Sequence, residues 1–226
     1  MTRAGNEVYD GPGDLPAVVP VFPLAGVLLL PRRVLPLNIF EPRYLAMIEA
    51  VLSGDRLIGM IQPRLDTPHP MIPSRPPLER VGCVGRLTQF GETGDGRLTI
   101  GLTGIARFRV AEELATTTPY RLCQIDAAPF ATDFEAGRGE AVVDRAAVLK
   151  TLSAWLAVHA PQLDRSGFEE AGNEALVDGL AMMSPCGPRE KQALLEAPSL
   201  EERAALLIAI TERSLGGEGT PTGPLQ

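Results

Sequence analysis

The residue types that most often catalyse reactions or bind metals are scarce in this chain. Histidine occurs only at His69 and His159, and cysteine only at Cys83, Cys123 and Cys186. None of these residues has the short spacing typical of zinc ligands, and no C-x-x-C pair is present. A zinc site would have to combine residues without ligand spacing, and a Cys–His catalytic pair is disfavoured because Cys83 and Cys123 fall within predicted strands, where thiols are usually buried and inert. We therefore expect neither a metal nor an organic cofactor.

The cysteines are best explained as reduced thiols. Their number is odd and no two lie close together, a pattern that fits a reducing compartment better than a disulfide framework. Cys83 and Cys123 fall within predicted strands, where buried and unreactive thiols are usual. Cys186, in the sequence Ser-Pro-Cys-Gly-Pro, is the cysteine that we expect to be exposed.

Composition and charge narrow the range of partners. The 226 residues are 45% hydrophobic and 22% charged, as in ordinary globular proteins. The net charge of −7 disfavours non-specific binding to nucleic acid or to anionic membranes. Residues 1–16 contain no apolar segment of the kind found in signal peptides, and no apolar run reaches the roughly 18 residues of a membrane span. We therefore expect a soluble, cytoplasmic protein, and the excess of arginine over lysine (19 to two) suggests a GC-rich bacterial genome.

Short apolar segments predict a β-rich domain over residues 17–130. Residues 81–90 and 97–103 should form a hairpin, because the Gly-rich sequence 91–96 between them contains an Asp-Gly pair. This Gly-rich sequence could suggest a phosphate-binding loop, but it precedes a strand rather than a helix. The other predicted strands, each of strand-like length or alternation, are 17–22, 26–30, 57–61, 104–110 and 120–127.

One helix and two irregular segments complete this half of the chain. Pro42 suits the first turn of a helix, apolar residues follow at helical spacing to Leu52, and Gly54 could end the helix. Residues 1–16 contain three glycines and two prolines, which predict a flexible arm. Residues 63–78 contain six prolines and predict a long irregular loop, a type that is often functional or disordered.

From residue 138 the apolar period becomes helical. The S-x-x-E sequences at 166–169 and 199–202 each predict the start of a helix, and Pro188 predicts another. With an amphipathic segment around Leu152, they predict about four helices over residues 138–215. The Gly/Pro-rich residues 216–226 should form a disordered tail.

Several motifs together resemble one known family. They are V-F-P-L at 21–24, L-P-L-N-I-F-E-P-R-Y at 35–44, V-G-C-V-G-R at 81–86, L-T-G-I-A-R-F-R-V at 102–110, P-Y at 119–120, K-Q-A-L-L-E at 191–196 and E-E-R at 201–203. In order and spacing they resemble the Lon protease N-terminal domain, or Lon substrate-binding domain, which also occurs in stand-alone proteins. The resemblance covers nearly the whole chain. It implies an α+β fold, with a PUA-like, mainly antiparallel β-barrel that contains one inserted helix, followed by a C-terminal α-helical domain.

The catalytic modules of a complete Lon protease are not found in this sequence. There is no Gly-Lys pair, so the chain lacks the G-x-x-x-x-G-K-[ST] loop that an ATPase needs to bind phosphate. A Ser–Lys peptidase needs a lysine beside its nucleophile. The only lysines, Lys150 and Lys191, fall in predicted helices with no Gly-rich serine motif nearby. We therefore expect that this chain is not an enzyme.

The proline-rich loop and the start of the first predicted helix carry candidate ligand-binding residues. Met71 and Ile72 are apolar residues within the proline-rich loop. Exposed, they would form a patch of the kind that marks protein contacts; folded back, they would cover the core. Arg43 and Tyr44, beside Glu41, could line a ligand-contacting rim, or they could fix the helix start through a Glu41–Arg43 contact with Tyr44 half-buried.

Arg107 is a further candidate. It shares one face of a predicted strand with Arg109, and the two could form a basic groove. The competing interpretation is an ordinary solvated face of the strand.

These features favour a non-catalytic module that resembles the Lon substrate-recognition domain. It would bind unfolded or exposed polypeptide segments through the proline-rich loop and the junction between the barrel and the helical domain. It would act as an adaptor in protein quality control, with a protease or a chaperone as a further partner. The alternative is an RNA-binding PUA-like barrel, since barrels of this kind bind RNA in other families. Against RNA stand the acidic net charge and the low aromatic content of 5%, which offers no evident platform for stacking bases. A small hydrolase would lack a credible nucleophile–base pair.

Overall fold

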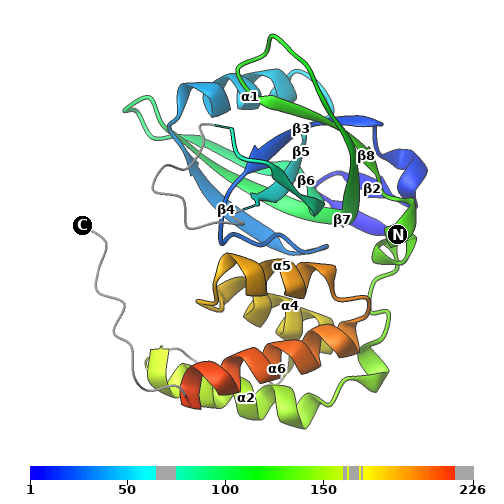
Figure 1. Ribbon diagram of the computed structural model, residues 1–226, viewed down its shortest axis with the longest axis vertical. Helices are drawn as coiled ribbons and strands as arrows, with labels where there is room; N and C mark the ends of the chain where they lie inside the picture. The colour runs from blue at the N-terminus through cyan, green and yellow to red at the C-terminus, as the bar shows by residue number, and fades with distance from the viewer. Residues whose placement is uncertain (65–74, 160–161, 163–167, 169, 217–226) are drawn as a thin grey trace.

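Residues 18–126 form a six-stranded sheet with one helix across its end (Figure 1). The computed structural model describes residues 1–64, 75–159, 162, 168 and 170–216. The strand order is β4-β7-β6-β5-β3-β8, and an additional pairing of β7 with β8 completes a closed circuit of five paired strands. Only β3 and β5 pair in parallel; the other pairs are antiparallel. The strands are β3 (Val18–Pro23), β4 (Val34–Ile39), β5 (Leu57–Pro63), β6 (Leu78–Glu92), β7 (Leu98–Leu114) and β8 (Arg121–Asp126).

The predicted hairpin at the Gly-rich sequence is confirmed. The backbone N–H of Thr93 donates to the carbonyl of Arg97 at 3.2 Å, and the paired strands β6 and β7 run from this turn. The two segments predicted at 97–103 and 104–110 are a single long strand, β7. Gly82, on β6, is required by its surroundings, since an added Cβ would lie 2.5 Å from the ring of Phe108. The V-G-C-V-G-R motif therefore allows strands to pack closely over an aromatic core.

The segment 26–30 differs from its prediction as a strand. Leu28, Leu29 and Leu30 are buried as expected, but they form no strand. Instead the chain crosses β7 at Gly104, where the N–H of Arg32 donates to the Gly104 carbonyl at 2.8 Å. An added Cβ on Gly104 would lie only 2.1 Å from the Leu30 carbonyl oxygen. The apolar run was thus correctly identified as core, but a backbone crossing replaces strand pairing.

Helix α1 (Pro42–Leu52) is confirmed, with Pro42 in its first turn. Tyr44, Met47 and Ile48 lie on its buried face, which packs into the main core of the protein. The residue that caps its C-terminal end is Ser53, one position before the predicted Gly54, and the Ser53 hydroxyl donates to the Glu49 carbonyl at 3.2 Å.

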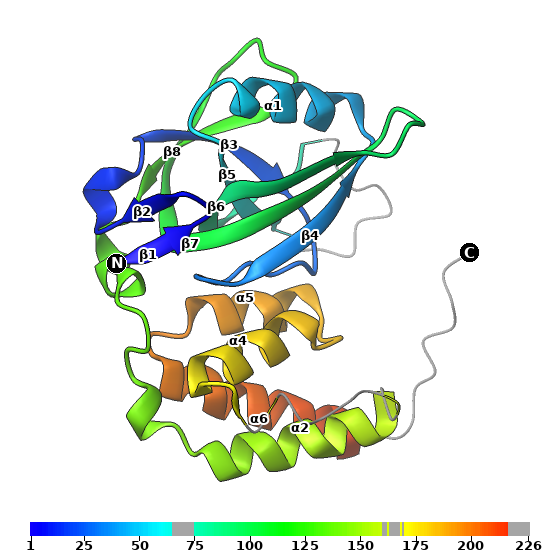
Figure 2. The ribbon, with the colours of Figure 1, turned by 180° about the vertical axis from the view of Figure 1, so that it is seen from behind.

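The N-terminal residues differ from the predicted flexible arm. Strands β1 (Thr2–Ala4) and β2 (Glu7–Tyr9) form an antiparallel hairpin beside β7 (Figure 2). Ala4 and Tyr9 are buried in a second apolar cluster that includes Phe134. The apolar residues of this segment are few and widely spaced, so a prediction from composition is dominated by its glycines and prolines.

The helices of the second half lie together below the sheet, on the side opposite α1 (Figure 1). The predicted start at Ser199 is confirmed, since the N–H of Glu202 donates to the Ser199 hydroxyl at 3.1 Å. The other predicted start, at 166–169, falls largely outside the described residues. No helix in the described part of the chain is both long and apolar enough to cross a bilayer. The α-helices described here are α2 (Arg145–His159), α4 (Asn173–Met183), α5 (Pro188–Glu196) and α6 (Leu200–Gly216).

Helix α5 docks these helices on the sheet. The amide of Gln62, on β5, donates to the Pro188 carbonyl at 2.9 Å and to Gln192 at 3.1 Å, while Gln192 donates to the Val81 carbonyl at 3.1 Å. Lys191 is buried and donates to the carbonyls of Ala181 and Met182 at the end of α4. The K-Q-A-L-L-E motif therefore positions the helices against the sheet.

Candidate functional site

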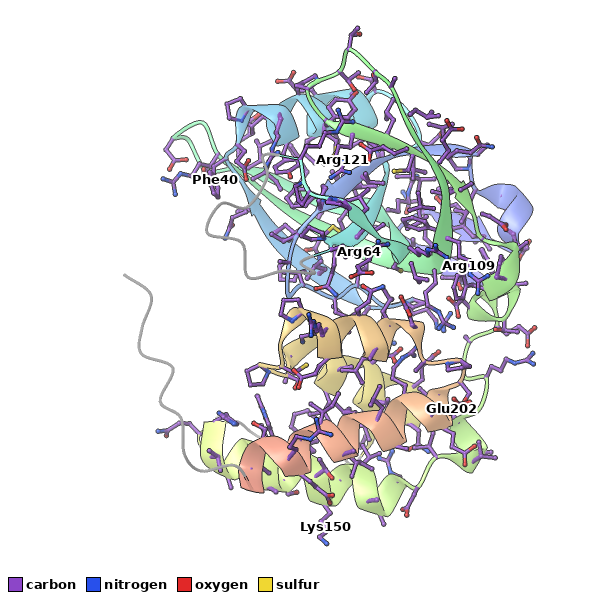
Figure 3. The ribbon with its side chains drawn as sticks, viewed as in Figure 1. Phe40, Arg64, Arg109, Arg121, Lys150 and Glu202 are labelled. Atoms are coloured by element: carbon purple, nitrogen blue, oxygen red, sulfur yellow. The ribbon has the colours of Figure 1, made fainter. Side chains whose placement is uncertain are left out.

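A hollow of about 360 Å³ lies where α1 begins, β3 and β5 end, and the chain enters β8. Figure 3 shows Arg121, one of its lining residues, under α1 and away from the helices that follow residue 138. Its lining combines proline rings, two tyrosines and three arginines. The lining residues are Pro23, Arg43, Tyr44, Pro63, Arg75, Pro76, Thr118, Pro119, Tyr120 and Arg121.

Aromatic stacking fixes one wall of the hollow. The rings of Tyr44 and Phe22 are stacked with their centroids 4.0 Å apart, which joins the first turn of α1 to β3. Tyr44 is only 5% exposed, and burial raises the pKa of its hydroxyl above the ordinary value. The side chain was expected to be half-buried and is more deeply placed. It offers an uncharged, rigid surface at physiological pH.

Arg43 lies over this aromatic wall. Its Nε donates to Glu41 Oε2 at 2.9 Å, and its guanidinium carbon is 4.5 Å from the centroid of the Tyr44 ring. The Glu41–Arg43 contact expected for a fixed helix start is therefore present. The same contacts hold the exposed Arg43 side chain at the edge of the hollow. Arg43 can therefore both fix the start of the helix and line a ligand-contacting rim.

A second carboxylate joins the other two arginines. Glu113, on β7, accepts from Arg75 at 2.6 Å and from Arg121 at 2.9 Å, and Arg121 also donates to the Pro76 carbonyl at 2.8 Å. The hydrogen bonds from Arg121, followed by those from Arg75, hold the pKa of Glu113 below its ordinary value. This network, the Arg75–Glu113–Arg121 cluster, fixes residues 75 and 76 against β7 and β8.

The segment that leads into β8 is held by its own side chains. The hydroxyl of Thr118 donates to the Tyr120 carbonyl at 2.8 Å, and the Thr118 N–H donates to the hydroxyl of Thr116 at 3.1 Å. These bonds position Pro119 and Tyr120 without support from a strand. Tyr120 is half-buried and is one of the residues that line the hollow.

Three of the motifs noted in the sequence meet at this hollow. V-F-P-L supplies Pro23, the E-P-R-Y end of the second motif supplies Arg43 and Tyr44, and P-Y supplies Pro119 and Tyr120. The remaining lining residues come largely from both ends of the proline-rich loop, where the N–H of residue 64 donates to the carbonyl of residue 77 at 2.7 Å. Sequence reasoning named two of the ten lining residues as candidates.

The candidates Met71 and Ile72 lie outside the described residues. The described chain stops at Arg64 and resumes at Arg75, and Arg75 lines the hollow. The missed residues Arg75 and Arg121 carry no local motif; their positions at the loop end and at a strand start were the only available signal.

Arg107 does not lie on a solvated face. It lines a hollow of about 250 Å³ where the sheet meets the helical half, but this hollow is not a basic groove, because its four arginines are accompanied by four Asp and Glu residues. Arg107 is 4% exposed and covered by the helical half of the protein, with its Nη2 2.7 Å from Asp133 Oδ1. Its Nη1 donates to the carbonyls of Leu195 at 3.0 Å and Ala197 at 2.7 Å. Arg109, two residues later, is exposed as expected. Strand alternation assigned both to one face, but it could not show that a second layer covers only one of them.

The cysteines are placed as the sequence predicts. Cys83 and Cys123 are buried and Cys186 is partly exposed. Burial raises the pKa of Cys123 to about 11 and raises that of Cys83 further, so neither is an activated nucleophile. In the described part of the chain, no three His, Cys, Asp or Glu side chains are arranged to hold a metal ion.

Comparison with known proteins identifies the family. Residues 18–213 match the family described as the ATP-dependent protease La (LON) substrate-binding domain, and the chain belongs to that family. The match is to the substrate-binding domain of Lon and does not include a protease domain. The sequence is 28% identical over 204 residues to Lon protease 2 of Myxococcus xanthus and 30% identical over 210 residues to Lon protease 2 of Sorangium cellulosum. These alignments cover 88% and 87% of this chain but 24% and 25% of the relatives, so the chain spans about a quarter of their length.

Solved structures support the same α+β fold. A Lon N-terminal domain protein from Xanthomonas campestris is similar with a TM-score of 0.58 at 19% identity, over 85% of this chain and 97% of that one. The N-terminal domain of a Mycobacterium avium complex Lon protease is similar with a TM-score of 0.58 at 20% identity, over 86% and 98% of the two chains.

Proposed function

We propose that this protein binds unfolded or exposed segments of other polypeptides at the hollow between α1, the loop ends and β8, and that it does so without catalysing a reaction. The observation that carries the proposal is the meeting of three family-like motifs at this one hollow. Membership of the substrate-binding family supports a polypeptide ligand. The protein would then act as an adaptor that presents polypeptides to a protease or a chaperone.

The lining supports this proposal physically. Tyrosine combines a large apolar ring with a hydroxyl, and proline rings add rigid apolar surface, so both give contact area at a low entropic cost. The guanidinium groups add hydrogen-bond donors at the edge of the hollow. Such a surface can accept many side chains, as recognition of unfolded segments requires.

The test is a binding titration with matched variants. Fluorescence anisotropy would measure the binding of a labelled, permanently unfolded polypeptide, such as reduced and carboxamidomethylated lactalbumin, to the wild type, Tyr120→Ala and Phe90→Ala. Phe90 is the matched control, since this exposed aromatic residue lines a different hollow that is also about 360 Å³. We expect Tyr120→Ala to weaken binding at least about fivefold, in keeping with a loss of roughly 1 kcal/mol or more for an aromatic anchor, and Phe90→Ala to leave it unchanged.

Three results would contradict the proposal. Equal binding by the wild type and Tyr120→Ala, with both folded by circular dichroism, would exclude this hollow. Weaker binding only in Phe90→Ala would move the site to the outside of the β6–β7 hairpin. Absence of polypeptide binding together with tight, salt-sensitive binding of a single-stranded RNA would favour the RNA alternative.

A further inference from the structure

Among the described residues that line the hollow, the charged ones are all arginines, although two carboxylates just outside the lining, Glu41 and Glu113, pair with them. These arginines are Arg43, Arg75 and Arg121. The chain as a whole has a net charge of −7, so a site with three guanidinium groups stands out from its surroundings. A locally positive hollow on an acidic protein attracts and orients negatively charged groups.

The Arg75–Glu113–Arg121 cluster has one positive charge more than its carboxylate can balance. Glu113 is the shared acceptor for both arginines. Each guanidinium carries five N–H donors arranged to bind carboxylates in pairs. The Arg75 side chain is 56% exposed and the Arg121 side chain 11% exposed. Arg75 can therefore meet a ligand from solvent, while Arg121 holds Glu113 in place.

Apolar surface lies directly beside this positive group. Tyr120 immediately precedes Arg121, and Pro76 immediately follows Arg75, so each arginine has an apolar neighbour that lines the same hollow. A ligand that places a carboxylate at Arg75 would bring its adjacent side chain against these rings. The site thus combines one excess positive charge with an apolar surface of side-chain size.

We propose that the preferred ligand is an extended peptide segment in which an apolar or aromatic side chain lies next to a carboxylate. The carboxylate binds Arg75 at the Arg75–Glu113–Arg121 cluster, and the apolar side chain enters the hollow against Tyr120 and Tyr44. This selectivity rests on the proposed function and names the class of polypeptide that the same site selects.

A single excess charge matches one carboxylate better than a nucleic acid. Proteins that bind RNA or DNA through the backbone contact several phosphates along a basic track, and their affinity depends steeply on salt. Here the arginines are confined to one hollow, and each is already hydrogen-bonded to Glu41 or Glu113. The arrangement therefore favours a peptide with one or two acidic residues.

The test compares three labelled peptides of about ten residues with amidated C-termini. The first contains a Leu-Phe pair flanked by aspartates, the second has asparagine in place of both aspartates, and the third has lysine. We expect the first to bind about fivefold more tightly than the second, as a partly exposed ion pair allows, and the third to bind most weakly. Raising the salt concentration from about 50 mM to about 0.5 M should reduce this preference, since the carboxylate pairing is partly screened.

Matched charge reversals locate the effect. Arg75→Glu should abolish the preference for the aspartate peptide. Arg138→Glu should keep it, although Arg138 is equally exposed (57%) and has a similar ion pair, 2.7 Å from Glu135. Both side chains are on the surface, so folding should survive, and Arg75→Gln provides a second, milder variant that should reduce the preference by a smaller factor.

The outcomes separate this inference from the proposed function. Equal affinity for the aspartate and asparagine peptides would overturn the inference and leave polypeptide binding intact. A preference that persists in both Arg75 variants would also overturn it. Binding of none of the three peptides and of no unfolded polypeptide would overturn the proposed function itself.

Discussion

Replacing Arg107 by methionine should destabilise the protein by about 3–5 kcal/mol, the usual cost of leaving one partner of a buried ion pair behind. Methionine keeps much of the length and apolar volume of the arginine stem, so the change removes mainly the guanidinium. The site is the contact between the sheet and the helical half, where Arg107 and Asp133 are 4% and 7% exposed.

The magnitude follows from the contacts that are lost. In the wild type, the Arg107 side chain donates to Asp133 at 2.8 and 2.7 Å and to the carbonyls of Leu195 and Ala197 at 3.0 and 2.7 Å. In the variant, the carboxylate of Asp133 still accepts the hydrogen bond from the backbone N–H of residue 107, which is 2.9 Å long in the wild type, but it has lost the positive charge that balanced it. Since whole domains are stable by only about 5–15 kcal/mol, the expected loss is a large fraction of the total.

Urea denaturation would measure this loss with two signals. Trp155 is the sole tryptophan of the chain and lies in α2, so its fluorescence reports on the helical half, while far-ultraviolet circular dichroism reports on the whole chain. For an m-value of about 2–3 kcal/mol/M, the midpoint should fall by roughly 1 to 2.5 M. Because the contact joins the two halves, we expect the fluorescence and circular dichroism transitions to separate in the variant.

Two further variants define what would refute this reasoning. Arg109→Met is the control on the same strand. Because Arg109 is exposed, we expect the free energy of unfolding to change by no more than about 0.5 kcal/mol. In Arg107→Met/Asp133→Leu the orphaned carboxylate is removed, so part of the lost stability should return. Equal midpoints for Arg107→Met and Arg109→Met would show that Arg107 does not support the contact between the two halves.

Three other predictions follow from single side chains. Cys186 should react first with a thiol reagent near pH 8, because it is the partly exposed cysteine and burial raises the pKa of Cys123 to about 11 and that of Cys83 further. The substitution Cys186→Ser should therefore remove the fast phase of the reaction, and two or more fast thiols in the folded wild type would contradict this. Lys191→Met should cost about 1.5–3 kcal/mol by urea denaturation, since it removes two charged hydrogen bonds from the end of α4. For Glu113, the arginine contacts lower its folded-state pKa, so its ion pairs stabilise the protein above the ordinary glutamate pKa of about 4.3. That stability should be lost as the pH falls from there through the lowered pKa. Stability curves for the wild type and Glu113→Gln should therefore differ at pH 7 and converge in acid, and a difference that does not depend on pH would contradict the assignment.

Local chemistry made several elements predictable from the sequence. The Asp-Gly turn before β7, Pro42 at the start of α1 and Ser199 before α6 act within a few residues of themselves. Such signals determine backbone geometry through caps and turns and need no tertiary information. The motif comparison extended this reasoning to the α+β fold.

Features that depend on distant parts of the chain were not predictable in the same way. The Arg75–Glu113 contact joins residues 38 positions apart, and the bond from Arg107 to the Leu195 carbonyl spans 88 positions. A single sequence shows that Arg107 is charged and on a strand face, but not that α5 and the following turn cover that face. Likewise, Ala4 and Tyr9 of the N-terminal hairpin are buried in a cluster with Phe134 and strand residues, partners that the composition of residues 1–16 cannot indicate.

The most direct test of the central claim is hydrogen–deuterium exchange of the wild type with and without a saturating unfolded polypeptide. If the hollow is the binding site, exchange should slow in peptides that cover residues 43–47 and 116–122, which contribute Arg43, Tyr44 and Tyr120 to its lining. Exchange in α2 and α6, which lie away from the hollow, should not change (Figure 3). Protection confined to those helices, or to β4 and the β6–β7 hairpin, would contradict the account and assign binding to another surface.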